Sequence, residues 1–392
     1  MIEAPGDWPR WRGPSGQGAV RDTGYVDSWS DTRNVAWKTP LNGQGNSSPI
    51  VWGDRIFITA AYESGQRRSI QCFDRSNGQI AWETFAPAGP APERAHRKNG
   101  YASGTPSTDG ELVYAFLGNH GLLCADFAGK QVWSRRLGSL NAYHGTACSP
   151  LLYKEYVVVL QDHRGSGGSF VAAYSKQTGE EVWRTSREAR VGWCSPVAVR
   201  SDGIDQIIIS GHTRVIAYNP ADGKELWSCR GNLVEVIPTP VTSDGLLFCC
   251  SGRAGPTLAI RSGGSGDVTA SHLAWRSSKG SPFIPSPVAY ERRLYMVNDM
   301  ASVATCYQAA TGKVLWQGRL GEPRSHGFSS SGVAFEGKVY FTNDDGETYV
   351  LAAGDEFKIL GVNRINERML ASPALVGGNW YFRTAGHLVS VG

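Results

Sequence analysis

The chain has 392 residues, including 48 Gly, 20 Pro and 13 Trp, and its formal net charge is only +4. Basic and acidic side chains are interspersed, which excludes neutralisation of nucleic-acid phosphates as the main role. No apolar run approaches the length of a membrane span, about 18 residues. We therefore expect neither a nucleic-acid partner nor a membrane span.

The N-terminal 20 residues contain the polar and aromatic phrase DWPRWRGPSGQG and no apolar core of a signal peptide. The eight cysteines form neither a CxxC pair nor a zinc-ligand spacing with histidine. The sequence thus indicates no metal ligand and no catalytic residue, and the redox compartment stays open.

A phrase ending in Trp recurs along the chain at spacings of 41 to 51 residues. The seven copies contain Trp37, Trp82, Trp133, Trp183, Trp227, Trp275 and Trp316. An eighth copy, EFKILGVNRI, carries Leu360 and Gly361 instead. A ring once per repeat predicts packing between neighbouring repeats, with the indole N–H donating to a backbone carbonyl.

Two further phrases recur in step with the tryptophans. One has a small residue and Pro before an apolar run, as in SSPIVWGDRIFITAA and ASPALVGGNWYFRTAG, and has eight copies. The other is a strand ending in a Gly turn, as in FVAAYSKQTGE. Each period thus holds four short strands, A to D. This pattern predicts an all-β fold, an eight-bladed propeller of four-stranded antiparallel blades in one domain spanning residues 1–392.

The two ends of the chain complement each other. Residues 34–40 form a D strand with no partners before it, and residues 371–392 supply A, B and C strands with no D strand after them. We therefore predict that residues 34–40 become the outer strand of the closing blade. Such closure removes an exposed strand edge, whereas a linear solenoid would need caps that the sequence lacks.

The Gly-x-x-x-Trp phrase resembles the tryptophan-docking repeat of the pyrroloquinoline-quinone (PQQ) propeller superfamily, over essentially the whole chain. DWPRWRGPSGQG resembles the opening of a bacterial group of PQQ-like repeat proteins. The superfamily includes quinoprotein dehydrogenases and an outer-membrane-assembly propeller lipoprotein without a cofactor. The resemblance implies a periplasmic or extracellular protein that is either a binding scaffold, our expected function, or an enzyme: a PQQ-dependent dehydrogenase or a saccharide-active hydrolase or lyase.

The dehydrogenases of this superfamily hold calcium through Glu, Asn and Asp, and carry a disulfide between adjacent cysteines over the quinone. Here Cys249 and Cys250 are adjacent, but GLLFCCSG is typical of a B strand, whose consecutive side chains point to opposite faces. We expect packing residues, with a vicinal disulfide as the alternative. No calcium motif and no CxxCH is found, so no cofactor is assigned and PQQ with calcium stays an alternative.

Propeller topology brings the D–A connections and the B–C turns to one face around the central channel. These segments contain seven of the eight histidines, and only His272 falls elsewhere. The uneven distribution predicts a binding mouth, although strands exclude polar residues in any case. The expected ligand-binding residues are Tyr101, His120, His144, His163, Trp193, Glu235, Arg253, His326 and Arg368. The same segments also carry His96, His212, His387, Asn46, Phe283, Asp299 and Asp344.

Two features of this mouth have alternative interpretations. Glu235, in LVEVIP, either has a raised pKa through burial or forms an ion pair with Arg253 or Arg368. The insertion at residues 87–100 is either a lid or partner contact, or a surface loop. The expected partner is a polar small molecule such as a saccharide, or an envelope protein, and we expect a monomer.

Overall fold

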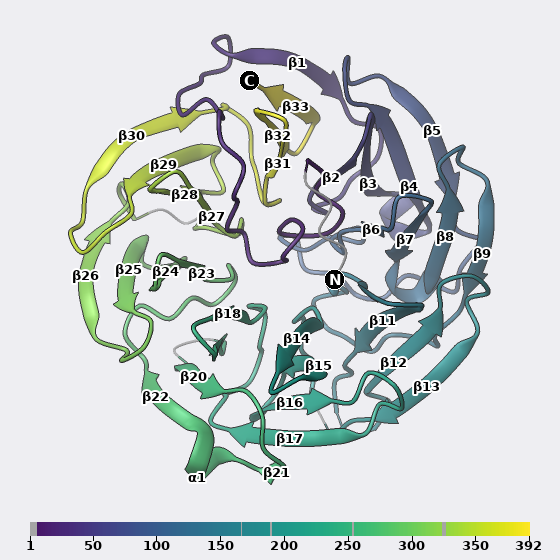
Figure 1. Cartoon of the computed structure of the whole chain (residues 1–392). Helices are drawn as coiled ribbons and strands as arrows, with labels where there is room; N and C mark the ends of the chain where they lie inside the picture. Colours follow the sequence, from purple (N-terminus) through teal and green to yellow (C-terminus); the bar gives the residue numbers. More distant parts are fainter. Residues whose placement is uncertain (1–5, 166, 189, 253–254, 324–326) are drawn as a thin grey trace.

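The computed structural model describes residues 6–165, 167–188, 190–252, 255–323 and 327–392. The described residues form eight antiparallel sheets, arranged as the blades of a disc around a central axis (Figure 1). In each blade the strand order runs outward from the axis, and in seven of the eight blades the innermost strand is the shortest. The predicted eight-bladed β-propeller is therefore confirmed.

Blades are numbered in chain order. Blade 1 contains β2 (Ile50–Trp52), β3 (Arg55–Tyr62), β4 (Arg67–Asp74) and β5 (Ile80–Phe85). Blade 2 contains β6 (Ser107–Thr108), β7 (Leu112–Phe116), β8 (Leu122–Asp126) and β9 (Gln131–Arg135). Blade 3 contains β10 (Leu151–Tyr153), β11 (Tyr156–Gln161), β12 (Phe170–Ser175) and β13 (Glu181–Ser186). Blade 4 contains β14 (Val197–Ser201), β15 (Ile204–Ser210), β16 (Arg214–Tyr218), β17 (Glu225–Arg230) and β21 (Gly266–Asp267).

The second half of the disc repeats this plan. Blade 5 contains β18 (Val241–Ser243), β19 (Leu246–Cys250), β20 (Thr257–Arg261) and β22 (Leu273–Ser277). Blade 6 contains β23 (Val288–Tyr290), β24 (Arg293–Asn298), β25 (Val303–Gln308) and β26 (Val314–Arg319). Blade 7 contains β27 (Val333–Phe335), β28 (Lys338–Thr342), β29 (Glu347–Ala352) and β30 (Ile359–Arg364). Blade 8 contains β31 (Ala374–Val376), β32 (Asn379–Arg383), β33 (His387–Val391) and β1 (Val35–Pro40). Short helices η1 (Glu63–Gly65), η2 (Gly118–His120) and α1 (Thr269–His272) lie between strands.

Blade 8 closes the ring as predicted. β1 pairs antiparallel with β33, with Trp37 opposite Ser390 and Pro40 opposite His387. Figure 1 shows β1 on the outer rim beside the C-terminus. The first and last strands of the fold therefore share one sheet, and the disc has no open edge between them.

The repeated tryptophans join neighbouring blades. In each outer strand pair a β-bulge adjoins the Trp position, as between Ala173 and Tyr174 opposite Trp183, and such a bulge re-aims a side chain. The Trp37 indole donates to the Arg75 carbonyl of blade 1 at 3.1 Å. Gly78, at φ +72°, lies against the same ring, because an added Cβ would be 2.4 Å from it.

The same contact recurs around the disc with one exception. Five further indoles donate to a carbonyl of the next blade at 2.8–3.0 Å, from Trp82, Trp133, Trp183, Trp275 and Trp316. Trp227 donates instead to the Gln206 side chain of its own blade. The prediction is wrong for this residue because β21 and α1 cover the outer edge of blade 4 after β17.

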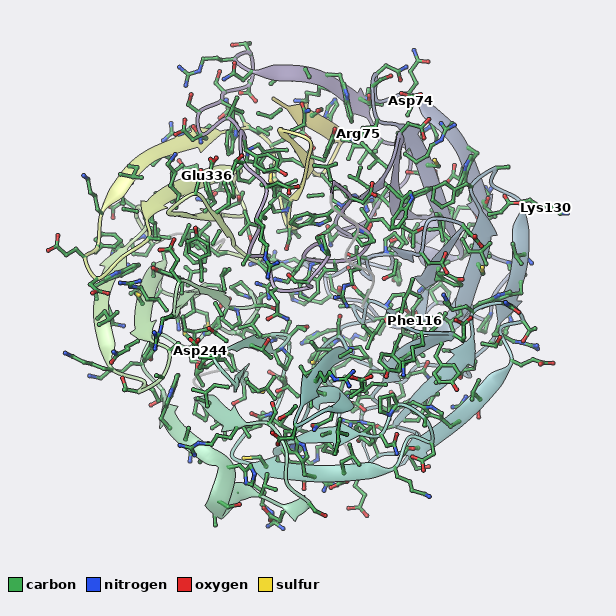
Figure 2. The ribbon with its side chains drawn as sticks, viewed as in Figure 1. Asp74, Arg75, Phe116, Lys130, Asp244 and Glu336 are labelled. Carbon is green, nitrogen blue, oxygen red and sulfur yellow. The ribbon has the colours of Figure 1, made fainter. Side chains whose placement is uncertain are left out.

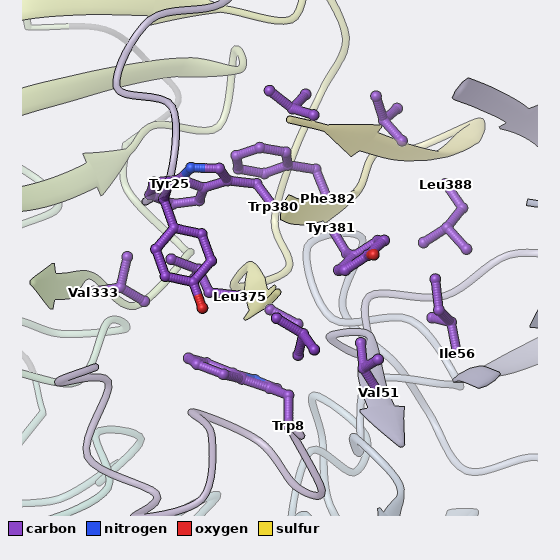
Figure 3. Close-up of a cluster of buried hydrophobic side chains, with 14 of the residues drawn as sticks. Trp8, Tyr25, Val51, Ile56, Val333, Leu375, Trp380, Tyr381, Phe382 and Leu388 are labelled. Carbon is purple, nitrogen blue, oxygen red and sulfur yellow. The ribbon is translucent and has the colours of Figure 1, made fainter. Parts of the chain in front are cut away.

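N-terminal residues complete the core of the closing blade. Trp8 and Tyr25 are buried together with Leu375, Trp380 and other blade 8 side chains (Figure 3). Trp29 packs on Trp380 with ring centroids 4.9 Å apart. At the other side of blade 8, Arg75 of blade 1 donates a hydrogen bond to Tyr381 Oη at 2.8 Å. Figure 2 labels Arg75 at this position and Lys130 on the outer rim. The same N-terminal region thus supplies both a strand and part of the core of blade 8.

Candidate functional site

A closed ring of hydroxyl groups surrounds the central channel. One Ser or Thr per blade, immediately before the innermost strand, accepts a hydrogen bond at 2.9–3.0 Å from the backbone N–H of its counterpart in the preceding blade. We call this set the hydroxyl ring: Ser48, Thr105, Ser149, Ser195, Thr239, Ser286, Ser331 and Ser372. Ser372 donates to Ser48 and so completes the circle. The small-residue-Pro phrase of the repeat therefore encodes this ring, since a residue before Pro favours extended backbone.

The ring lines a central cavity of about 550 Å³. All eight ring residues contact this cavity. The Thr239 hydroxyl bonds to the Cys194 thiol, and among the described residues no further acceptor is found for the other seven hydroxyls. Aromatic and aliphatic walls complete it, formed by Trp11, Trp193, Phe283, Ile237 and Met300. Apolar walls with a few convergent polar donors are the usual composition of a small-molecule site.

One end of the channel is closed by residues 8–20, which we call the N-terminal plug. This segment crosses the middle of the disc in Figure 1. It hydrogen-bonds with five blades at or beside their innermost strands, through Val51, Thr108, Thr242, Pro287 and Ala334. Arg12 is 2% exposed and its guanidinium donates to the Pro287 carbonyl at 2.6 Å. The plug places Trp11 against the cavity, so the phrase DWPRWRGPSGQG builds its closed end.

The insertion at residues 87–100 forms part of the wall at the open end. Glu93 and Arg68 are fully buried and form a bidentate ion pair at 2.6 and 2.8 Å. Asn99 donates to the His144 carbonyl at 2.7 Å, and Lys98 reaches across the mouth to Asp344 of blade 7 at 2.9 Å. These contacts hold the insertion against several blades at the mouth.

Two carboxylates at the mouth, Asp299 and Asp344, are engaged by protein donors. Asp299 accepts backbone N–H groups of Phe283 and Ile284 at 2.8 and 3.3 Å, and burial raises its pKa. Asp344 accepts the Ser329 N–H at 2.7 Å and pairs with Lys98. Both carboxylates therefore orient the D–A segments that form the wall.

An aromatic cluster occupies the wall between blades 2 and 4. The His144 ring stacks on Trp193 with centroids 5.7 Å apart and meets His96 edge-on at 4.9 Å. The Trp193 indole donates to the Gly145 carbonyl at 2.8 Å, which holds the ring in place. Tyr143 donates to the Glu235 carboxylate. His96, His144 and Trp193 present their faces or edges to the central cavity.

Of the expected ligand-binding residues, the structure places His144 and Trp193 at the cavity. His120 is buried behind the wall, its Nε2 3.0 Å from the Gln66 carbonyl, and burial lowers its pKa. Tyr101 lies over the Arg68 guanidinium at 5.3 Å. His163 bonds to Gln161 and Asn141, and burial lowers its pKa.

The other predicted positions lie apart from the cavity or outside the described residues. Arg368 lines a separate small hollow with Arg383 and Thr384. Glu235 bonds to Tyr143, in a loop where its own φ is +60°. Arg253 and His326 lie outside the described residues, so the proposed ion pair of Glu235 with Arg253 stays a prediction.

Three contributors to the cavity were not expected from the sequence: the hydroxyl ring, Trp11 of the plug and Lys98 of the insertion. The ring had a signal, because Ser or Thr precedes Pro in seven of the eight repeats and precedes Gly332 in the other. Trp11 and Lys98 lie in segments that occur once, so no repeat pattern marks them.

The residues present do not fit a quinone with calcium. Cys249 and Cys250 are free thiols on β19, buried in two different clusters on opposite faces of that strand, and burial raises the pKa of Cys250 to about 12. Asp299, which lines the cavity, accepts backbone N–H groups, and Asp344 beside it pairs with Lys98. Among the residues that the structure describes, no three His, Cys, Asp or Glu side chains are grouped to hold a metal ion.

Within the described ranges, no helix is long and apolar enough to cross a membrane.

Comparison with known proteins identifies the family. The profile described as outer membrane protein assembly factor BamB matches residues 16–139 and 66–299. BamB of Burkholderia pseudomallei (strain K96243) is 25% identical over 333 residues, covering 79% of this chain and 76% of that protein. Because the profile matches more than half of the chain, the predicted relationship to PQQ-like propellers is confirmed.

Solved structures share the fold at low identity. BamB from Moraxella catarrhalis superposes with a TM-score of 0.64 at 16% identity, covering 90% of this chain and 97% of that one. Quinohemoprotein alcohol dehydrogenase from Comamonas testosteroni gives 0.73 at 12% identity, covering 98% and 80%. These two resemblances concern the fold alone. The profile match shows the family: the chain belongs to the BamB-type family of PQQ-like β-propellers.

Proposed function

We propose that this protein is a non-catalytic binding propeller of the cell envelope, periplasmic or extracellular, that takes a polar, saccharide-like ligand in its central cavity. The observation that carries the proposal is the hydroxyl ring. Eight hydroxyls accept a backbone N–H, and seven of them, all but Thr239, keep their O–H free to donate inside a cavity walled by aromatic side chains. Sugars combine hydroxyl acceptors with apolar ring faces, so this composition suits them.

The family relationship supports the envelope location, since the relatives matched are outer membrane assembly factors. It also favours a second candidate, a protein partner docked on the same face. Leu233, Val234 and Met300 are 43%, 48% and 68% exposed in D–A and B–C segments around the mouth. Exposed apolar side chains next to a mouth suit a protein contact. In either case we expect a monomer.

Enzymatic alternatives find less support in the cavity. Hydrolysis of a glycosidic bond typically uses a pair of carboxyl groups that exchange a proton with the substrate or attack it. Asp299 and Asp344 are instead engaged by backbone N–H groups and Lys98. A binding role therefore fits these two carboxylates better, because it does not require them to leave their present partners.

Calorimetric titration against a panel of neutral and charged oligosaccharides tests the proposal. We expect binding by the wild type, loss of at least about tenfold in affinity for Trp193→Leu, and unchanged affinity for Trp316→Leu, which removes a ring of similar burial from a blade junction. Trp316→Leu controls for lost stability. If no saccharide binds and a pull-down recovers one envelope protein, the function is binding of a protein partner. If a saccharide is converted to product, the protein is an enzyme.

A further inference from the structure

A second hollow, of about 670 Å³, adjoins the mouth of the central cavity. We call it the basic groove. Its lining comes from the insertion at residues 87–100, the blade 2 to 3 connection and the blade 3 B–C turn: Arg94, Ala95, His96, Arg97, Tyr143, His144 and Arg164. Three guanidinium groups and two imidazoles thus face one hollow, and no carboxylate lines it.

The arginines of the groove differ from two buried arginines near the mouth. Arg68 and Arg187 are buried and paired with Glu93 and Asp162 at 2.6 and 2.9 Å. Arg94, Arg97 and Arg164 are exposed, and the described residues place no carboxylate within salt-bridge distance of them. Their positive charge is therefore available to a ligand.

The groove has a defined frame. Glu93 is held by Arg68, and the His96 N–H donates to the His144 carbonyl at 3.2 Å, so the insertion is attached on both sides of Arg94 and Ala95. The Arg164 N–H donates to the Asn141 carbonyl at 2.6 Å, and its guanidinium lies 5.6 Å from the Tyr143 ring centroid. A guanidinium placed over an aromatic ring is oriented as well as charged.

The groove and the central cavity are joined but chemically different. His96 and His144 line both. The cavity presents hydroxyls and aromatic faces, and its Lys98 is neutralised by Asp344. The groove presents guanidinium groups, which bind carboxylate, sulfate or phosphate through paired hydrogen bonds. A ligand that fills both hollows therefore has a neutral, hydroxylated part and an anionic part.

We propose that the basic groove binds the anionic group of an acidic oligosaccharide whose neutral sugar residues occupy the central cavity. This inference rests on the proposed saccharide-binding function and specifies the ligand class for it. The anionic group is a carboxylate, sulfate or phosphate ester, which share the same geometry of recognition by Arg. His144 at the junction and Trp193 in the cavity wall favour a sugar over an acidic peptide, because aromatic side chains pack against the apolar face of a pyranose ring.

Three oligosaccharides of equal length test the inference: tetragalacturonic acid, its carboxyl-reduced neutral form and a sulfated galactose tetramer. We expect the wild type to bind the acidic forms at least about tenfold more tightly than the neutral form, with the difference shrinking in 0.5 M salt, at which charges are screened within about 5 Å. R94Q/R97Q/R164Q should abolish that difference and leave neutral binding unchanged. The relative affinities of the galacturonate and the sulfated tetramer identify the anionic group.

A matched variant controls for net charge. R33Q/R261Q/R276Q removes three exposed arginines away from the mouth, and it should keep the preference for acidic forms. Equal binding of acidic and neutral tetramers by the wild type would overturn this inference and leave the proposed function standing. No binding of any tetramer would overturn both. Equally tight, Arg-dependent binding of tetraglutamate would assign the groove to acidic peptides.

Discussion

The two ends of the central channel are built on different principles. At the closed end, the N-terminal plug forms hydrogen bonds to five blades through backbone and side-chain groups and buries Trp8 at 1% exposure. At the open end, D–A segments and the insertion at residues 87–100 present charged and aromatic side chains to the cavity and the basic groove. Between the two ends runs the hydroxyl ring, contributed equally by all eight blades.

This difference separates what a repeat supplies from what single segments supply. The repeat forms a symmetric wall, because each blade contributes the same Ser or Thr at the same position. The plug and the insertion occur once each. The plug closes one end of the channel, and the insertion places basic side chains on one side of the other end. Variants at the two ends test this division.

The largest effect is expected at the closed end. Trp8→Ala removes a buried ring from the core of the closing blade and should lower the free energy of unfolding by about 4 kcal/mol. Trp11→Ala, a half-buried residue of the same phrase, should cost less than half as much and change the cavity instead. Denaturant unfolding measures both, and equal losses would contradict the anchoring role of Trp8.

A somewhat smaller effect is expected beside the open end. Glu93→Gln leaves the buried Arg68 guanidinium without its counter-charge and should cost about 3 kcal/mol. Glu63→Gln breaks a pair with Arg67 at 3.5 Å, in which both side chains are more than half exposed, and should cost less than about 1 kcal/mol. If the two variants unfold at the same denaturant concentration, Glu93 does not anchor the insertion.

The hydroxyl ring should respond to the loss of a single hydroxyl. Ser195→Ala leaves the buried Ser149 N–H without its acceptor and should cost about 1–2 kcal/mol. Ser195→Thr keeps the hydroxyl, as Thr105 and Thr239 do in their own blades, and should be nearly neutral. Thermal unfolding of the pair measures the difference, and equal midpoints would mean that the ring contributes nothing to stability.

The smallest effect concerns pH at the closing blade. Burial raises the pKa of Glu367, but hydrogen bonds from Thr384 and Gly386 and the nearby His387 and Lys38 lower it by more, so the pKa is lowered overall. Its ionised form stabilises the fold above the unfolded pKa of about 4.3, and this contribution is lost as pH falls through the folded pKa. Between about pH 5 and 3, Glu367→Gln should therefore lose stability less steeply than the wild type; parallel profiles would contradict this.

Much of the architecture could be predicted from the sequence because each blade of the propeller repeats the same sequence phrases. The blade number, the pairing of residues 34–40 with the last blade and six of seven Trp contacts followed from local phrases that recur. The exception, Trp227, depends on β21 and α1, which come from a single inserted segment after β20. A repeat predicts only those contacts that every repeat makes.

The site was less predictable for the same reason. His144 and Trp193 were placed at the mouth correctly by topology, whereas His120 and His163 occupy predicted turns but turn into the wall. Topology gives the face on which a loop emerges, and side-chain direction within the loop depends on packing across blades. The plug could not be predicted, because its partners lie on five blades spread over the whole chain.

The path of the N-terminal region also has a consequence for biosynthesis. Arg12 bonds to Pro287, 275 positions later, and β1 pairs with β33 at the end of the chain. This segment is synthesised before its partners, so it must wait until they have emerged from the ribosome before it can pair with them. Until then the ring of blades and the closed end of the channel stay incomplete. The central cavity therefore forms only in the last step of folding, and a prematurely ended chain lacks it.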